Sequence, residues 1–146
     1  QKVVYRHPLD PKLCIKMAKP NRQESLDREI KYLKRHQDQL HFLSLYSGEV
    51  ETNLGKGYLF SLICDADGAI SKPLTEVFTE LDGLSEKVEL MYRGLLKNMA
   101  AVSELEPCNL LVKRWDDVSY EIYLIDGFGN SDFIKICDLL ELSVKT

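Results

Sequence analysis

A short polar segment, Asp65-Ala66-Asp67-Gly68, divides the chain into two parts of different pattern and so limits the folds open to it. Before it, alternating segments at residues 2–7, 13–18, 48–53 and 56–65 predict two β-hairpins with one helix between them. After it, apolar residues at helical spacing predict helices over residues 73–81, 85–101 and 132–142, with a hairpin inside residues 108–130. This order predicts an α+β fold in two small lobes.

Two helices carry an apolar stripe. After Pro20, Asn21 and Glu24 have the spacing of a helix N-cap and its reciprocal partner. The stripe that follows the cap consists of Leu26, Ile30, Leu33 and Leu40, and that of residues 85–101 consists of Val88, Met91, Tyr92, Leu95 and Met99.

Composition narrows the class of protein. With 146 residues, 45% of them hydrophobic, the chain is long enough for one domain with a real core. The net charge of -4 gives no reason to expect nucleic acid, and no apolar run approaches the ~20 residues that span a bilayer. The four cysteines are scattered in apolar contexts, which predicts buried free thiols and a cytoplasmic protein. Because the chain opens on Gln1 rather than Met, we expect it to be a fragment.

Lys16 and Glu29 are candidates for a buried ion pair. Glu29 lies three residues after Leu26 and four before Leu33, on the helix face that should be buried. A buried carboxylate needs a cationic partner, and Lys16 on the preceding strand could provide it. The alternatives are that Lys16 is a solvated strand lysine and that Glu29 lies at the edge of the stripe.

Asn109 and Asp126 stand at the two ends of the later hairpin. Asp126 follows an apolar strand and precedes Gly127 and Gly129, which allow close approach of a ligand. A carboxylate at such a position suits a hard cation such as Mg²⁺, which takes oxygen ligands and often phosphates. The alternative is an ordinary Asp-Gly turn at the end of a hairpin with polar ends.

In their order along the chain, these positions resemble the protein-kinase-like fold. "CIK" at residues 14–16 is similar to that family's V-A-I-K, and "REIKYL" at 28–33 resembles its αC helix. "ELEPCNLLV" at 104–112 resembles the catalytic loop, and "IDGFG" at 125–129 stands where the family has D-F-G. The chain is closer still to the bacterial YrbL family, which is linked to the PhoP regulatory network. That family's "VET…GxGY" hairpin and D-x-D-G connector are similar to residues 50–58 and 65–68.

The resemblance implies a domain layout and a ligand. The N-lobe would span residues 1–64 without a Gly-rich loop, the hinge 65–72, and a reduced C-lobe 73–146. ATP and Mg²⁺ would be the cofactors, and the backbone of Ile63, Cys64 and Asp65 would face the adenine. Lys16, held by Glu29, would contact the phosphates, while Asn109 and Asp126 would hold the metal.

At the catalytic loop, however, the chain differs from an active kinase. Val102 and Ser103 replace the histidine and arginine, Glu104 replaces the catalytic aspartate, and Glu106 replaces the loop lysine. A carboxylate displaced by about 1 Å can cost about 10²-fold in rate, and Glu106 reverses a charge beside the transferring phosphate. Because only 17 residues follow Gly129, we expect no full activation segment and no large helical subdomain in this chain.

Three functions therefore stay open. The first is a YrbL-like protein that binds nucleotide and transfers phosphate weakly or not at all, in bacterial signalling. The second is an active kinase for a small molecule or a protein, with Glu104 as base. The third is a scaffold that binds a protein partner and no nucleotide.

Overall fold

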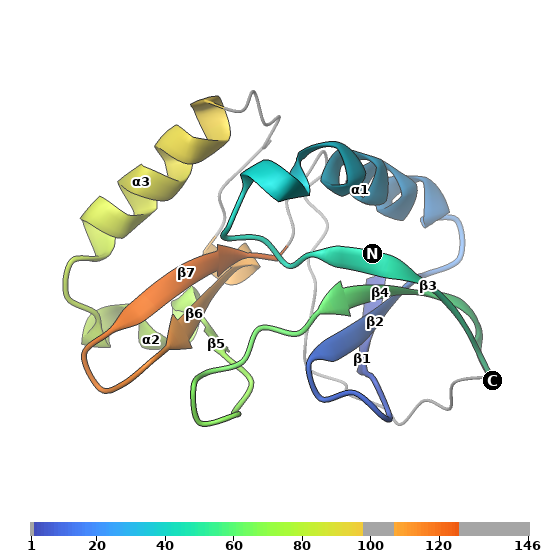
Figure 1. Ribbon diagram of the computed structural model, residues 1–146, viewed down its shortest axis with the longest axis horizontal. Coiled ribbons are helices and arrows are strands. Elements are labelled where there is room, and N and C mark those ends of the chain that lie inside the picture. The colour runs from blue at the N-terminus through green and yellow to red at the C-terminus, as the bar shows by residue number, and fades with distance from the viewer. Residues whose placement is uncertain (1, 98–106, 126–146) are drawn as a thin grey trace.

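The computed structural model describes residues 2–97 and 107–125 and has two antiparallel sheets with helices packed against them (Figure 1). The fold is therefore α+β, as predicted. The elements in chain order are β1 (Lys2–Arg6), β2 (Leu13–Ala18), α1 (Gln23–His36), η1 (Gln37–Gln39), β3 (Tyr46–Thr52), β4 (Gly55–Ser61), β5 (Lys72–Pro73), α2 (Leu74–Val77), η2 (Phe78–Glu80), α3 (Leu84–Lys97), η3 (Pro107–Asn109), β6 (Leu110–Arg114) and β7 (Tyr120–Leu124).

The first sheet has the strand order β1-β2-β4-β3 and lies under α1 (Figure 1). Lys16 is opposite Val4 on one side and Tyr58 on the other, so these three side chains share a face. Leu26, Ile30 and Leu33 of α1 belong to the same core cluster as Val4 and Tyr58. The opposite face carries a smaller cluster centred on Tyr5 and Ile15. The α1 side of this sheet therefore contains both the helix stripe and Lys16.

Gly57 is required by close packing inside this sheet. A Cβ atom at Gly57 would lie 2.4 Å from Cγ2 of Ile15, far inside van der Waals contact. The preceding turn is closed by Thr52, which is fully buried. Its hydroxyl donates to the Gly55 carbonyl oxygen (2.7 Å) and accepts from the Leu54 amide (3.1 Å).

The second sheet, β5-β6-β7, packs against α2 and α3 and continues the main core. Two backbone links join it to the first part of the chain. The Ser44 amide donates to the Leu124 carbonyl (3.2 Å), and the Leu124 amide donates to the Phe42 carbonyl (2.7 Å). Leu43 thus forms a parallel bridge with Leu124. The segment between η1 and β3 therefore runs as a short strand beside the end of β7.

The connector between the two parts is held by Asp65. Its carboxylate accepts hydrogen bonds from the Arg114 amide (2.9 Å) and the Ser71 hydroxyl (2.7 Å). This carboxylate ties the D-x-D-G segment to β6, so the aspartate that opens the segment has a structural explanation.

Several predicted details were wrong. Arg22 rather than Asn21 is the N-cap of α1, without a side-chain cap, because Asn21 is in the left-handed region (φ 64°). The strand expected over 56–65 ends at Ser61. The helix expected over 73–81 has one α-helical turn, Leu74–Val77, followed by the 3₁₀ turn η2. Tyr92 is 51% exposed despite its place in the stripe. The helix predicted over 132–142 lies outside the described residues.

Candidate functional site

A buried ion pair joins β2 to α1. The Lys16 ammonium donates to Oε1 of Glu29 at 2.8 Å, and the two side chains are 3% and 1% exposed. Strand alternation places Lys16 on the α1 side of the sheet, and the helical period turns Glu29 inward with Leu26 and Leu33. The ion pair predicted from the sequence is confirmed. The alternatives of a solvated Lys16 and an edge position for Glu29 are wrong.

A second lysine, Lys2 of β1, contacts the other oxygen of the same carboxylate. Lys2 is itself buried. Burial alone would raise the pKa of Glu29, but the charges of Lys16 and Lys2 and their hydrogen bonds lower it below its ordinary value. Glu29 is therefore an ionised carboxylate inside the protein. Sequence reasoning missed Lys2, although its alternation with Val4 was a signal that it lies on the buried face.

Lys16 also reaches the second sheet. Its ammonium donates to the Ile125 carbonyl oxygen at 3.1 Å and lies 4.0 Å from the centre of the Phe60 ring. Ile125 is the residue directly before Asp126. The lysine therefore connects α1, the first sheet and the end of β7 at one point.

Asn109 lies beside this point. It ends η3, is buried, and its backbone carbonyl accepts from the Ile125 amide at 3.0 Å. Lys16 and Asn109 both hydrogen-bond Ile125, and Glu29 joins this group through Lys16. Asp126 and Glu104 lie outside the described residues, and their assigned roles stay predictions.

The metal part of the prediction can be tested against donor chemistry. Within residues 2–97 and 107–125 no cluster of three or more His, Cys, Asp or Glu side chains is placed to hold a metal. The amide oxygen of Asn109 is a suitable single ligand for Mg²⁺, which binds through one or two protein oxygens together with phosphates and water. The residues fit a metal that arrives with a nucleotide better than a metal held by protein alone.

Hydrogen bonds already occupy part of the backbone of residues 63–65, the segment that was predicted to face an adenine. The Ile63 carbonyl accepts from the Ser71 amide (3.0 Å), and the Asp65 amide donates to the Ala69 carbonyl (2.8 Å). This pattern turns the amide and carbonyl of Cys64, between them, to the other side of the segment. Of the three residues, Cys64 is the one whose amide and carbonyl both point away from these hydrogen bonds.

A small cavity adjoins Lys16. Its volume is about 20 Å³, space for about one water molecule. It is lined mainly by apolar side chains, among them Val4, Cys14, Ile63, Leu111 and Ile125. An adenine ring is larger than this cavity. Ile63, Cys64 and Asp65 also line a wider hollow of about 580 Å³, together with Lys12 and Lys113.

The thiol of Cys14 in this cavity is chemically quiet. Burial raises its pKa to about 11, although the positive charge of Lys16 opposes the shift. Cys14 is buried, whereas Cys64 and Cys108 are only partly buried, so the prediction of buried cysteines was wrong for these two. Cys137 lies outside the described residues.

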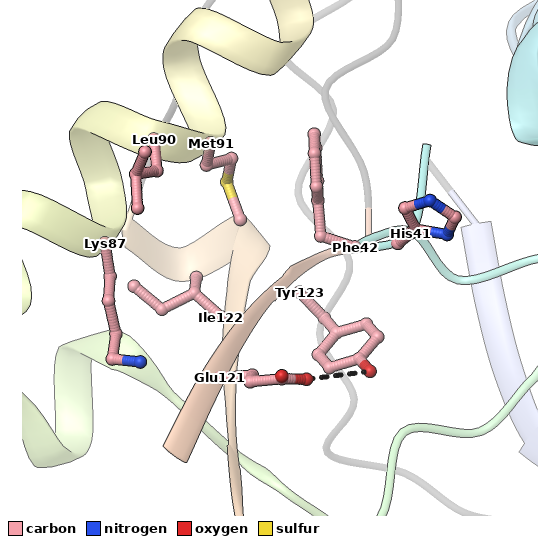
Figure 2. Close-up of a pocket in the computed structure, with 8 residues that line it drawn as sticks. All are labelled: His41, Phe42, Lys87, Leu90, Met91, Glu121, Ile122 and Tyr123. Carbon is pink, nitrogen blue, oxygen red and sulfur yellow. Dashed lines mark hydrogen bonds between the residues drawn. The ribbon is translucent and has the colours of Figure 1, made fainter. Parts of the chain in front are cut away.

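Another hollow, of about 250 Å³, lies between α3 and β7 and was not predicted from the sequence (Figure 2). Leu90 and Met91 of α3 face Ile122 of β7 across it, and Phe42 lies on its far side. Glu121 and Tyr123 share a hydrogen bond at its edge (3.4 Å). Leu90 is 68% exposed, and this hollow shares no lining residue with the small cavity beside Lys16.

Comparison with known proteins identifies the family. The model of the family described as PhoP regulatory network protein YrbL matches residues 1–144. The chain belongs to the YrbL family. The uncharacterized YrbL proteins of Escherichia coli K12 and Shigella flexneri are each 29% identical over 144 residues, which cover 90% of this chain and 69% of the relative. No solved structure matches.

Membership of the YrbL family gives meaning to two motifs of the chain. Thr52 and Gly57 of the "VET…GxGY" hairpin close a turn and allow two strands to approach, and Asp65 of the connector fastens β6. Packing and hydrogen bonding within the fold therefore explain why these YrbL-like motifs have these residues. Lys16 and Glu29 differ from them, because a buried ion pair is not needed to close a turn or a sheet.

The described part of this YrbL-family chain contains no helix of the length and apolar character that crossing a membrane requires. Its cytoplasmic location stays a prediction.

Proposed function

We propose that this YrbL-family chain has a kinase-like, two-lobed fold, binds a magnesium nucleotide such as ATP, and transfers phosphate weakly or not at all. Its role would be in bacterial signalling or regulation, in keeping with the family's description as part of the PhoP regulatory network. The lobes would be residues 1–64 and 73–146, joined by the hinge at 65–72.

One observation carries the proposal. The Lys16 ammonium donates both to Glu29 of α1 (2.8 Å) and to the Ile125 carbonyl (3.1 Å), directly before Asp126. A lysine held by a helix glutamate can offer a cation to phosphates. A carboxylate that follows the neighbouring strand in sequence can bind the metal of those phosphates. Buried ion pairs are often neutral for stability or worse than apolar packing, so a site that keeps one invites a functional explanation.

In this proposal, different residues bind different parts of the magnesium nucleotide. Lys16 would contact the phosphates, Asn109 and Asp126 would hold Mg²⁺, and the backbone of Cys64 would meet the adenine. Mg²⁺ would neutralise part of the phosphate charge. Weak transfer follows from Glu104 and Glu106 in the catalytic loop. If transfer does occur, Glu104 is the candidate base, and Glu104→Gln should abolish it.

The test is a thermal-shift titration of the full-length protein with Mg-ATP. A ligand at 100 times its Kd stabilises the folded state by about 2.7 kcal/mol. We expect the wild type and Lys72→Met to show this shift, because Lys72 is an exposed strand lysine. Lys16→Met and Asp126→Asn should lose most of it. An equal shift in all four proteins would show that the nucleotide binds elsewhere.

The small cavity favours a second candidate function. Because it is about 20 Å³ and the Ile63 carbonyl and Asp65 amide are already hydrogen-bonded, the fold could act as a scaffold that binds a protein partner and no nucleotide. In that case no nucleotide would change the melting temperature, and Lys16→Met would leave partner binding intact.

A further inference from the structure

Lys2 and Lys16 converge on one carboxylate from neighbouring strands. Lys2 is opposite Ala18 and Lys16 is opposite Val4, so the two lysines lie two residues apart on the same face of the β1-β2 pair. Lys16 contacts Oε1 of Glu29 and Lys2 contacts Oε2. Both lysines are buried, at 2% and 6% exposure. Two ammonium groups are therefore held within the width of a single carboxylate.

This convergence is more than the fold requires. One lysine compensates one buried carboxylate, whereas a second ammonium brought to the same group adds repulsion between like charges and a further desolvation cost. A di- or triphosphate is a ligand that repays such an arrangement, because it presents several negative oxygens within a few ångströms. Lysine is a common phosphate ligand and acts as a compact point charge.

We propose that Lys2 is a second phosphate-contacting residue, so that Lys2 and Lys16 together form a two-lysine site for a polyphosphate group, with Glu29 holding both. The inference rests on the proposed nucleotide function and deepens it. Lys16 would be fixed by Glu29, Ile125 and Phe60, while Lys2 reaches the ligand from the edge strand β1.

Binding and stability can be measured separately. Lys2→Met removes a cation that stabilises ionised Glu29 but leaves the Lys16–Glu29 pair, so we expect a lower melting temperature whether or not Lys2 contacts a ligand. Ligand affinity, measured at a temperature where both proteins are folded, decides the question. A purely structural Lys2 would leave that affinity unchanged, whereas a phosphate-contacting Lys2 would not.

The experiment measures the affinity of the full-length protein for Mg-ATP, adenosine and inorganic pyrophosphate by calorimetry. We expect Lys2→Met to raise the Kd for Mg-ATP and pyrophosphate at least tenfold and to leave that for adenosine unchanged. Lys2→Arg, which keeps the charge, should recover part of the loss. Lys72→Met is the matched control and should bind as the wild type does.

Each outcome decides between the claims. If the wild type binds Mg-ATP and Lys2→Met binds it equally well, the role of Lys2 is overturned and the nucleotide function stands. If pyrophosphate binds in a Lys2-dependent way while ATP binds no better than pyrophosphate, the two-lysine site stands and the nucleotide function fails. If the wild type binds neither ATP nor pyrophosphate, both are overturned.

Discussion

Replacing Glu29 with glutamine gives the sharpest test of the buried charge cluster. The change keeps the shape of the side chain but removes the negative charge that Lys2 and Lys16 share. Breaking a buried ion pair by removing one partner typically costs about 3–5 kcal/mol. Since small domains have about 5–15 kcal/mol of stability in total, Glu29→Gln should remove a large part of it.

The size of this loss depends on the contacts that remain in the variant. Lys16 keeps its contacts with the Ile125 carbonyl and the Phe60 ring when the carboxylate is gone. These contacts offset part of the cost of the unpaired ammonium group. We therefore expect a loss of about 3–5 kcal/mol for the variant.

The assay is urea unfolding followed by circular dichroism across pH. The pKa of Glu29 is lowered in the folded state, so its stabilisation is present above its ordinary value of 4.5 and is lost as pH falls through the folded value. The difference between wild type and Glu29→Gln should therefore be largest above pH 4.5 and shrink as pH falls below it.

Glu24→Gln in the first turn of α1 is the matched control, because Glu24 is exposed on the same helix. It should change the free energy of unfolding by less than about 1 kcal/mol. A loss of similar size for Glu29→Gln, or a loss that does not shrink as pH falls below 4.5, would refute the electrostatic account of the cluster.

Three further predictions concern the first sheet. The pKa of Cys14 is raised from 9.0 to about 11, so the stability it contributes is fully present below pH 9 and is lost as pH rises through 11. Over that range the wild type should lose about 3 kcal/mol of unfolding free energy that Cys14→Ala does not lose, as measured by urea unfolding. Gly57→Ala should cost about 1–3 kcal/mol because its Cβ would lie 2.4 Å from Ile15, and the cost should fall in an Ile15→Ala background, whereas simple additivity in the double-mutant cycle would argue against the clash. Thr52→Val should cost about 1–3 kcal/mol through the lost hydrogen bonds of the β3–β4 turn, and an unchanged melting temperature would contradict that role.

Predictions from the sequence were most accurate where the hydrophobic period of one strand or one helix is enough to tell which side chains are buried. Alternation placed the hairpins of the first sheet, and the position of Glu29 between Leu26 and Leu33 predicted a buried carboxylate with Lys16 as partner. These predictions succeed because one side of a strand or helix is buried whatever the tertiary detail.

The failures occur where tertiary contacts decide. Asn21 has a good capping sequence, yet its left-handed backbone leaves Arg22 at the cap position. Tyr92 fits the stripe of α3 but is half exposed, because the sheet covers only part of that helix. Lys2 was overlooked because a lysine near the start of a strand is ordinarily solvated, and only the position of α1 makes it a partner of Glu29.

The bridge between Leu43 and Leu124 has a mechanical consequence for the site. The segment after α1 is hydrogen-bonded to both sides of Leu124, so the helix that holds Glu29 and the strand β7 are linked by the short segment of residues 37–44. A tilt of α1 would therefore also displace the end of β7. Glu29, which holds Lys16, and the end of β7 would then move together, and opening the small cavity would require the first sheet to rotate relative to both of them.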